Sequence, residues 1–307
     1  MRWRKLGLLW APDGRLPWAH SHAMLPTPMR LSDGRLRILL GVCDANIVSR
    51  VGWIDIHEKD PRRVINVAQE PVLDIGAPGH FDDNGVNPCC TVTLPDGSVR
   101  LYYVGYQLQR KIPYTLFTGL AQAPNAASNF QRVKPTPILD RGPAEPFFRT
   151  APFVRRRVDA PGWEVWYIGG GAFEFIDGRE QPRYSLRHMI SSDGIQWPST
   201  GTELLVPEGD EIGFGRPWVM NAGAEDWRLW YSVRSARGYR LGYAVSRDGQ
   251  NWHRRDEEVG IHPSPGEWDG EMICYGAIER IGEDYYLFYN GSGYGRTGVG
   301  LAVLEEG

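Results

Sequence analysis

The sequence lacks any apolar run close to the roughly 20 residues of a membrane-spanning helix, and it has no long basic run. Its 34 Lys and Arg nearly balance its 37 Asp and Glu, for a formal net charge of -3. We therefore expect neither a nucleic-acid partner nor a membrane partner. The N-terminal MRWRKLGLLWAPDG holds only about four consecutive apolar residues, too few for a secretory signal. A cytoplasmic protein is expected.

Cysteine is also scarce. Cys43, Cys89, Cys90 and Cys274 have neither the CxxC spacing of a zinc site nor the density of a disulfide scaffold. We expect each to be a reduced thiol in an apolar strand. Sustained helical periodicity is missing as well. What the chain has instead is 37 Gly, 23 Pro, 12 Trp and 14 Tyr, a composition typical of turn-rich β proteins.

An aromatic strand pattern recurs along the chain. Its five copies are LRILLGVCD (36–44), RLYYVGYQ (100–107), WEVWYIGGG (163–171), WRLWYSVRS (227–235) and YYLFYNGSG (285–293). Each is a β-branched and aromatic run that ends in Gly or another small residue, which predicts a strand. The equivalent positions Ile38, Leu101, Val165, Leu229 and Leu287 are 63, 64, 64 and 58 residues apart. The spacing predicts five repeated units.

Other strands surround each copy. A second strand-like run follows it, twice with the turn motifs SSDGIQW (191–197) and SRDGQNW (246–252). A residue twelve or thirteen positions upstream also aligns across the units: Pro26, Pro88, Pro152, Pro217 and Tyr275. An all-β, five-bladed β-propeller of four-stranded antiparallel blades is predicted, as a single domain over 1–307. The fifth unit lacks its fourth strand, and we expect residues 2–10 to supply it and close the ring.

These repeats resemble the five-bladed propellers of arabinanases, invertases, levansucrases and β-mannoside phosphorylases. The motifs SSDGIQW and SRDGQNW are similar to an S-x-DG-x-x-W element of those sugar-active proteins. The resemblance implies a substrate site in the axial funnel, near the starts of the inner strands. Repeats of this kind are architectural, and one fold hosts several chemistries.

The candidate site residues are the polar and aromatic residues just ahead of the aligned positions. They are Trp18, His20 and His22 in the first unit, Asp82 and Asp83 in the second, Glu145 and Arg149 in the third, Arg216 in the fourth, and Trp268, Asp269 and Glu271 in the fifth. The resembling hydrolases carry a base Asp on blade 1, a supporting Asp on blade 2 and an acid Glu on blade 3. At the blade 1 position this chain has HSH (20–22), and at the blade 3 position it has Arg149-Thr150. The catalytic triad of those hydrolases therefore cannot be assigned to this sequence.

The carboxylates are the candidate catalytic groups. Two carboxylates in a pocket of low dielectric repel each other, which separates an acid from a base at neutral pH. Asp83 and Glu271 are predicted in these roles, with Asp82 and Asp269 as the alternatives. The simpler interpretations are a capped turn at Asp82–Asp83 and a solvated rim at Asp269 and Glu271.

The cationic and aromatic residues are predicted to bind substrate. Arg149 and Arg216 either neutralise the acids or clamp a phosphate or carboxylate. Glu145, Trp18 and Trp268 are expected to complete the binding surface.

His20 and His22 stand two residues apart, so an extended strand would turn both toward the funnel. Contact with substrate is the prediction for both histidines. Acid–base work and a single divalent metal ion are the alternatives. Without that ion, no cofactor is expected.

The sequence therefore predicts a carbohydrate-active, glycoside-hydrolase-like enzyme acting on a glycosidic bond in the funnel. One alternative is a non-hydrolytic enzyme on the same scaffold, such as a phosphorylase, a glycosyltransferase or a tailoring enzyme of polysaccharide or natural-product biosynthesis. The other is a sugar-binding propeller without catalysis. The expected partner is a small carbohydrate or a sugar-containing molecule, and a homo-oligomer is left open.

Overall fold

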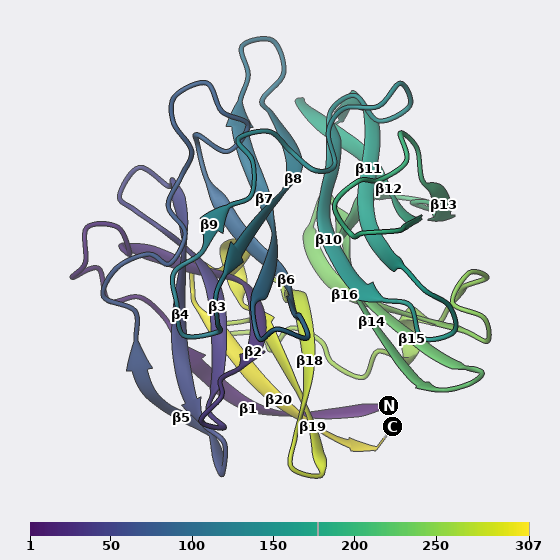
Figure 1. Cartoon of the computed structure of the whole chain (residues 1–307). Coiled ribbons are helices and arrows are strands. Elements are labelled where there is room, and N and C mark those ends of the chain that lie inside the picture. Colours follow the sequence, from purple (N-terminus) through teal and green to yellow (C-terminus); the bar gives the residue numbers. More distant parts are fainter. Residues whose placement is uncertain (177, 307) are drawn as a thin grey trace.

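The computed structural model describes residues 1–176 and 178–306, and nearly all its elements are β-strands (Figure 1). In that part of the chain the helical segments are a 3-10 turn, η1 (Asp256–Glu258), and a short helix, α1 (Ser292–Gly295). Neither is long or apolar enough to cross a membrane. The predicted all-β class is confirmed.

The strands fall into five antiparallel groups of four, which we name unit 1 to unit 5. Unit 1 contains β2 (Ser21–Arg30), β3 (Leu36–Cys43), β4 (Ser49–His57) and β5 (Asp60–Val67). Unit 2 contains β6 (Val86–Thr93), β7 (Val99–Leu108), β8 (Tyr114–Ala123) and β9 (Gln131–Arg132). Unit 3 contains β10 (Phe148–Arg156), β11 (Trp163–Ile176), β12 (Arg179–Ser191) and β13 (Thr202–Leu205). Unit 4 contains β14 (Glu211–Gly223), β15 (Asp226–Ser235), β16 (Gly238–Ser246) and β17 (His253–Arg254). Unit 5 contains β18 (Cys274–Ile281), β19 (Asp284–Asn290), β20 (Val299–Glu306) and β1 (Arg2–Trp10).

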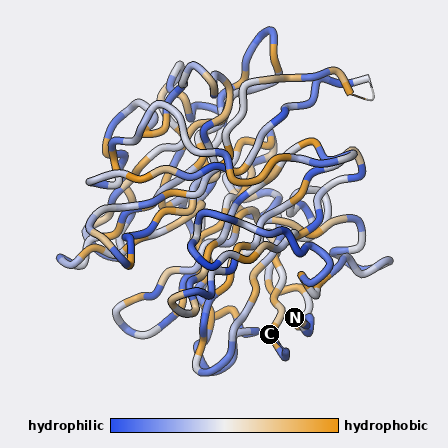
Figure 2. Tube along the Cα trace, turned by 90° about the vertical axis from the view of Figure 1, so that its right-hand side faces the viewer, coloured by the Kyte–Doolittle hydropathy of each residue, from blue (hydrophilic) through white to orange (hydrophobic). Residues whose placement is uncertain are grey.

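Unit 5 is built from both ends of the chain. β1 pairs antiparallel with β20, from Arg2 opposite Glu306 to Trp10 opposite Val299. The two termini consequently lie side by side in both views (Figures 1 and 2). Trp3 is buried in the hydrophobic core that units 4 and 5 share. The predicted use of residues 2–10 as the missing strand of the last unit agrees with this pairing.

The units are not all separate sheets. Units 2, 3 and 4 form one twelve-stranded sheet, whereas units 1 and 5 are four-stranded sheets. The joins are short and parallel: Phe148 and Arg149 of β10 pair with β8, and Tyr184 of β12 pairs with Gly213 of β14. The first strand of a unit therefore enters close beside the third strand of the preceding unit, and one or two residue pairs are enough to connect them.

The first strands of the units meet one another. β2 contacts β6, β6 contacts β10, β10 contacts β14, β14 contacts β18, and β18 contacts β2, which completes a cycle. Hydrophilic residues mark many of the loops at the periphery of the trace (Figure 2). The five first strands therefore surround one another, and each contacts the next in the cycle.

Each first strand also carries a bulge at the equivalent place. The register shifts lie between Met24 and Thr27, Pro88 and Cys90, Thr150 and Phe153, Gly215 and Trp218, and Cys274 and Ala277. Four non-glycine residues there have positive φ: Leu25 (50°), Ala151 (50°), Arg216 (26°) and Tyr275 (55°). Such backbone is uncommon and re-aims side chains. The repeat alignment set Tyr275 level with the prolines, but its positive φ matches that of the residues before Pro26, Pro152 and Pro217.

The two S-x-DG-x-x-W motifs are turns with an architectural role. In the first, Asp193 Oδ1 accepts from the backbone N–H of Ile195 and Gln196, and Asp248 Oδ1 does the same for Gln250 and Asn251 in the second. Gly194 and Gly249 have φ of 72° and 71°, which favours glycine, and each lies against a tryptophan ring at the start of the unit's second strand. The motif thus attaches the outer turn of a unit to its core.

Candidate functional site

A pocket of about 430 Å³ lies where the first strands of all five units meet, and we call it the central pocket. Its lining from those strands is Met24 and Leu25 (β2), Asn87 (β6), Phe148, Thr150 and Ala151 (β10), Phe214, Gly215 and Arg216 (β14) and Tyr275 (β18). The bulge residues of four units are among them. A concave site of this size is typical for a small ligand.

The chemistry of this lining is unusual for a sugar hydrolase. Six tyrosines line the pocket: Tyr106, Tyr114, Tyr184, Tyr239, Tyr275 and Tyr294. Its charged residues are Arg216 and Arg234, and no Asp, Glu or His is among the described residues that line it. The pocket therefore offers aromatic faces, hydroxyl groups and positive charge.

Arg216 forms the deepest charged part of the pocket. Its side chain is 1% exposed, and it reaches from unit 4 to three other units. Nη1 donates to the Tyr275 carbonyl (2.9 Å), and Nη2 donates to Thr27 Oγ1 (2.9 Å) and the Cys89 carbonyl (3.0 Å). These partners are all neutral, and Nε has none among the described residues. Burial lowers the pKa of Arg216 to about 10, while the thiols of Cys89 and Cys90 act in the opposite direction.

A chain of hydroxyl groups lies on the wall of the pocket. Arg234 Nη1 donates to the Tyr184 hydroxyl (3.0 Å), which lies 3.1 Å from the Tyr239 hydroxyl. The ring of Tyr239 is in turn 5.3 Å from that of Tyr275. Burial raises the pKa of Tyr239 well above its usual value, and its phenol can donate a hydrogen bond.

Three buried polar atoms in this lining have no partner within the described part of the protein. They are Asn87 Oδ1, Thr150 Oγ1 and Arg216 Nε, from three different units. A buried polar atom without a hydrogen bond costs about 1–3 kcal/mol. The three residues line the pocket, but these atoms are themselves buried, and Asn87 Oδ1 faces Gly41 of β3.

Three of the predicted acidic residues form ion pairs and hydrogen bonds outside the central pocket. Asp82 accepts from the Tyr103 hydroxyl (2.9 Å) and pairs with Arg132 (2.7 Å). Glu145 accepts from Tyr167 (2.7 Å) and pairs with Arg149 (2.6 Å). Asp269 accepts from Tyr289 (3.1 Å) and pairs with Lys5 (2.5 Å). All three carboxylates are buried, and none of them lines the central pocket.

The same arrangement recurs in unit 4 as Tyr231, Asp256 and Arg254. Its tyrosine, like Tyr103, Tyr167 and Tyr289, stands two positions after the equivalent residue of the aromatic strand pattern. The tyrosine that recurs in four of the five units is the feature of the sequence that could have indicated a repeated carboxylate partner. It identifies Asp82, Glu145 and Asp269 as buried ion-pair partners in a repeated structural contact.

The two carboxylates predicted first for catalysis also lie outside the central pocket. Asp83 is half-buried, and its Oδ2 accepts from the backbone N–H of Gly79 (2.8 Å), so it caps the turn that precedes it. The side chain of Glu271 is exposed, while its backbone N–H donates to Ser292 Oγ (3.1 Å). The structure does not bring these two carboxylates together in one cavity.

The histidines do not share a face. β2 begins only at Ser21, and His22 has a φ of 62°, so residues 20–22 are not the extended strand on which the prediction relied. His20 is exposed beside Gly14, whereas His22 is buried with Nδ1 2.9 Å from Ser21 Oγ. Burial, and then the charge of Arg296, lower the pKa of His22. Among the described residues no group of three or more His, Cys, Asp or Glu could hold a metal ion.

The remaining predicted residues are structural in their contacts. Arg149 is buried and donates to the carbonyls of Asp140 and Pro198 besides pairing with Glu145. Trp18 donates to the Gln69 carbonyl in a separate groove on unit 1. Trp268 packs on Tyr289, with ring centroids 5.5 Å apart. Of the residues predicted from sequence, Arg216 is the one that lines the central pocket.

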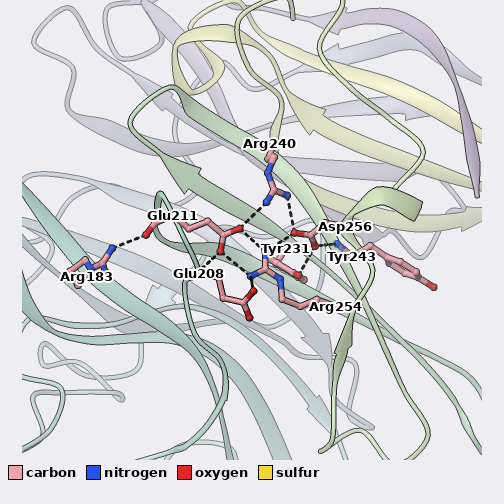
Figure 3. A network of polar contacts seen from close by, with 8 residues as sticks. All are labelled: Arg183, Glu208, Glu211, Tyr231, Arg240, Tyr243, Arg254 and Asp256. Carbon is pink, nitrogen blue, oxygen red and sulfur yellow. Dashed lines mark hydrogen bonds and ion pairs between the residues drawn. The ribbon is translucent and has the colours of Figure 1, made fainter. Parts of the chain in front are cut away.

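The ion-pair network of unit 4 makes stability depend on pH (Figure 3). Burial by itself would raise the pKa of Glu211 and Asp256, but hydrogen bonds from Arg254, and for Asp256 also from Tyr231 and Arg240, outweigh it and lower both pKa values. A lowered folded-state pKa stabilises the protein above the unfolded-state pKa, and this contribution disappears as pH falls through the folded-state pKa.

We therefore expect the free energy of unfolding, measured by urea titration at a series of pH values, to fall with decreasing pH below about pH 5. The slope should be smaller in Asp256→Asn, which removes one of these groups. Glu283→Gln, at an exposed position in the turn between β18 and β19, should keep the parent slope. An unchanged slope in Asp256→Asn would contradict this account of the network.

Comparison with solved structures identifies the class of fold as the glycoside-hydrolase-type propeller. A glycoside hydrolase has a TM-score of 0.72 at 16% identity, with 99% of this chain and 92% of the other covered. A thermostable family-43 glycoside hydrolase has a TM-score of 0.69 at 12% identity, with 94% and 90% covered. A member of the GH130 family of mannoside phosphorylases, which contains glycoside hydrolases, has a TM-score of 0.69 at 15% identity, with 98% of this chain and 93% of the other covered. The resemblance predicted from sequence is confirmed for the fold.

The family is shown by relatives of higher sequence identity. The chain is 33% identical to Uncharacterized protein Rv1502 of Mycobacterium tuberculosis (strain ATCC 25618 / H37Rv) over 308 residues, covering 100% of both proteins. It has the same identity and coverage with Uncharacterized protein MT1551 of strain CDC 1551 / Oshkosh. The chain therefore belongs to the family of these mycobacterial proteins. No protein-family model matches it.

Proposed function

We propose that this protein is a carbohydrate-active enzyme that acts on a sugar-containing substrate in the central pocket without a catalytic pair of carboxylates. We infer further that the five units are the blades of a single-domain propeller, that β1 closes the ring, and that the central pocket is its axial funnel. The cycle of contacts between the five first strands supports this inference. The sugar-active proteins named among the structural neighbours support the substrate class.

The lining of the central pocket is the observation that carries the proposal. Tyrosine rings present apolar faces that suit the C–H surface of a sugar, and their hydroxyls suit its polar edge. The chain from Arg234 through Tyr184 to Tyr239 aligns such hydroxyls along one wall.

Hydrolysis by two carboxylates is disfavoured by the same lining. That mechanism needs two carboxyl groups across the scissile bond, about 5–5.5 Å apart for retention or about 6.5–9.5 Å for inversion. Asp82, Glu145 and Asp269 are instead held by tyrosines and cations outside the central pocket. We therefore favour a transferase- or phosphorylase-like reaction.

A second candidate is a sugar-binding propeller without catalysis. It is favoured by the lack of a carboxylate or imidazole among the described residues that line the central pocket. Turnover distinguishes the two. Binding without any product from donor and acceptor sugars would select this second candidate.

The test is a screen of mono- and oligosaccharides by isothermal titration, together with an assay for reducing sugar released from aryl glycosides. We expect saturable binding and no hydrolysis. Tyr239→Phe should weaken binding about three- to tenfold, because one hydrogen bond is lost. Tyr286→Phe, in a half-buried tyrosine outside the central pocket, should bind as the parent does. Sustained hydrolysis, or binding unaffected by Tyr239→Phe, would overturn the proposal.

A further inference from the structure

We propose that Arg216 and Arg234 form an anion subsite in the central pocket and that the substrate is a sugar carrying a phosphate group. This inference rests on the proposed function and names its substrate class. Both guanidinium groups line the same cavity as the six tyrosines. Arg216 lies at the meeting point of four units, and Arg234 comes from β15 on the wall.

Arg216 differs from two other buried arginines of the protein. Arg37 is paired with Asp55 (2.7 Å), and Arg149 is paired with Glu145 (2.6 Å). Arg216 is more deeply buried than either, yet its hydrogen-bond partners are two backbone carbonyls and one hydroxyl. A buried charge without a counter-charge is costly. The protein neutralises Arg37 and Arg149 internally, so a ligand anion would supply the charge that is missing at Arg216.

The remaining donors of the cavity point to the same chemistry. Arg216 Nε has no acceptor among the described residues, and the Thr150 hydroxyl has no partner there. Arg234 donates to the neutral oxygens of Tyr184 (3.0 Å) and Gln181 (2.9 Å), and no described carboxylate forms an ion pair with it. A phosphate group has several acceptor oxygens and up to two negative charges, which suits two guanidinium groups and a hydroxyl. A sugar carboxylate would supply a single charge.

The deciding experiment titrates the protein with inorganic phosphate, glucose 1-phosphate, mannose 1-phosphate, glucuronate and methyl mannoside at one low ionic strength. We expect phosphate to bind, and at least one sugar phosphate to bind more tightly than phosphate alone. Chloride at the same ionic strength should leave the melting temperature of the protein unchanged. Affinity for phosphate should fall as salt rises, because the contact is electrostatic.

Arg234→Gln should weaken phosphate binding about tenfold to a hundredfold, because a charge-assisted hydrogen bond is lost. The matched control is Arg228→Gln on the same strand, where the arginine pairs with Asp226 on the surface outside the central pocket. It should bind phosphate as the parent does. Since Arg216 connects four units, Arg216→Lys is the second variant: it retains the charge and should keep part of the affinity if it folds.

The outcomes separate the two proposals. Phosphate binding that is equal in Arg234→Gln and Arg228→Gln, or no phosphate binding at all, overturns the anion subsite. If neutral sugars still bind in that case, the proposed function stands. Phosphate binding without affinity for any sugar leaves the subsite standing and overturns the proposed function. Glucuronate that binds more tightly than the sugar phosphates overturns the assignment to phosphate.

Discussion

Deletion of residues 1–10 will leave a protein that is largely unfolded or aggregated at 25 °C. β1 pairs with β20 along its whole length, so the deletion exposes the edge of β20. It also removes Trp3 from the core between units 4 and 5, and loss of a buried aromatic side chain costs about 3–5 kcal/mol. Finally it removes Lys5, the cation that pairs with the buried carboxylate of Asp269.

Together these losses are comparable to the free energy of unfolding of a typical domain, which is about 5–15 kcal/mol. The measurement is thermal and urea unfolding followed by circular dichroism. Two single variants divide the effect: Trp3→Ala tests the packing, and Lys5→Met leaves Asp269 unpaired, which we expect to cost about 2–4 kcal/mol. Arg4→Gln, at an exposed position of the same strand, should change stability by no more than about 0.5 kcal/mol. A deletion variant that melts at the parent temperature would refute ring closure by β1.

Replacement of Asp82 by Asn will destabilise the fold by about 2–4 kcal/mol, because Arg132 then loses its counter-ion beside a buried amide. Asp82 is fully buried, and its Oδ2 holds both Arg132 and the Tyr103 hydroxyl. The neighbouring Asp83→Asn offers a matched control. Its side chain caps an exposed turn at Gly79, so we expect a change of about 1 kcal/mol or less.

The comparison between Asp82 and Asp83 also decides between structure and catalysis. A catalytic carboxylate can be changed to its amide without loss of stability, while turnover falls about 10²- to 10⁴-fold. The measurement is urea unfolding of Asp82→Asn, Asp83→Asn and Glu271→Gln, together with turnover once a substrate is known. Asp82→Asn with the stability of the parent but without activity would restore the two-carboxylate mechanism that the sequence predicts.

The repeated strand pattern could be predicted because it is local. The β-branched and aromatic runs and the Asp-Gly turns act within a few residues, and the aromatic runs repeat at nearly constant spacing. The same reasoning assigned residues 2–10 to the last unit, where β1 pairs with β20. The join of units 2, 3 and 4 into one sheet was not predicted, because it depends on one or two contacts between strands of different units.

The candidate site was predicted only in part, because its contacts join residues that are far apart in the sequence. Arg216 was found because it stands beside an aligned proline, but nothing in its neighbourhood in the sequence shows that it lacks a carboxylate partner. The histidines were misplaced because a positive φ at His22 interrupts the strand that would have aligned them. The role of Asp82 depended on Tyr103 and Arg132, which are 21 and 50 residues away.

The sequence by itself therefore determined the all-β class, the repeated units and the use of both chain ends in the last one, because these follow from local patterns repeated along the chain. The tertiary structure alone decided which charges are neutralised and which remain free. Burial brings Lys5 to Asp269 and Arg132 to Asp82, across sequence separations that no local pattern reports. It also leaves Arg216 among neutral partners at the meeting point of four units. Whether a buried charge has a counter-ion depends on all the residues that pack around it, and these come from distant parts of the sequence.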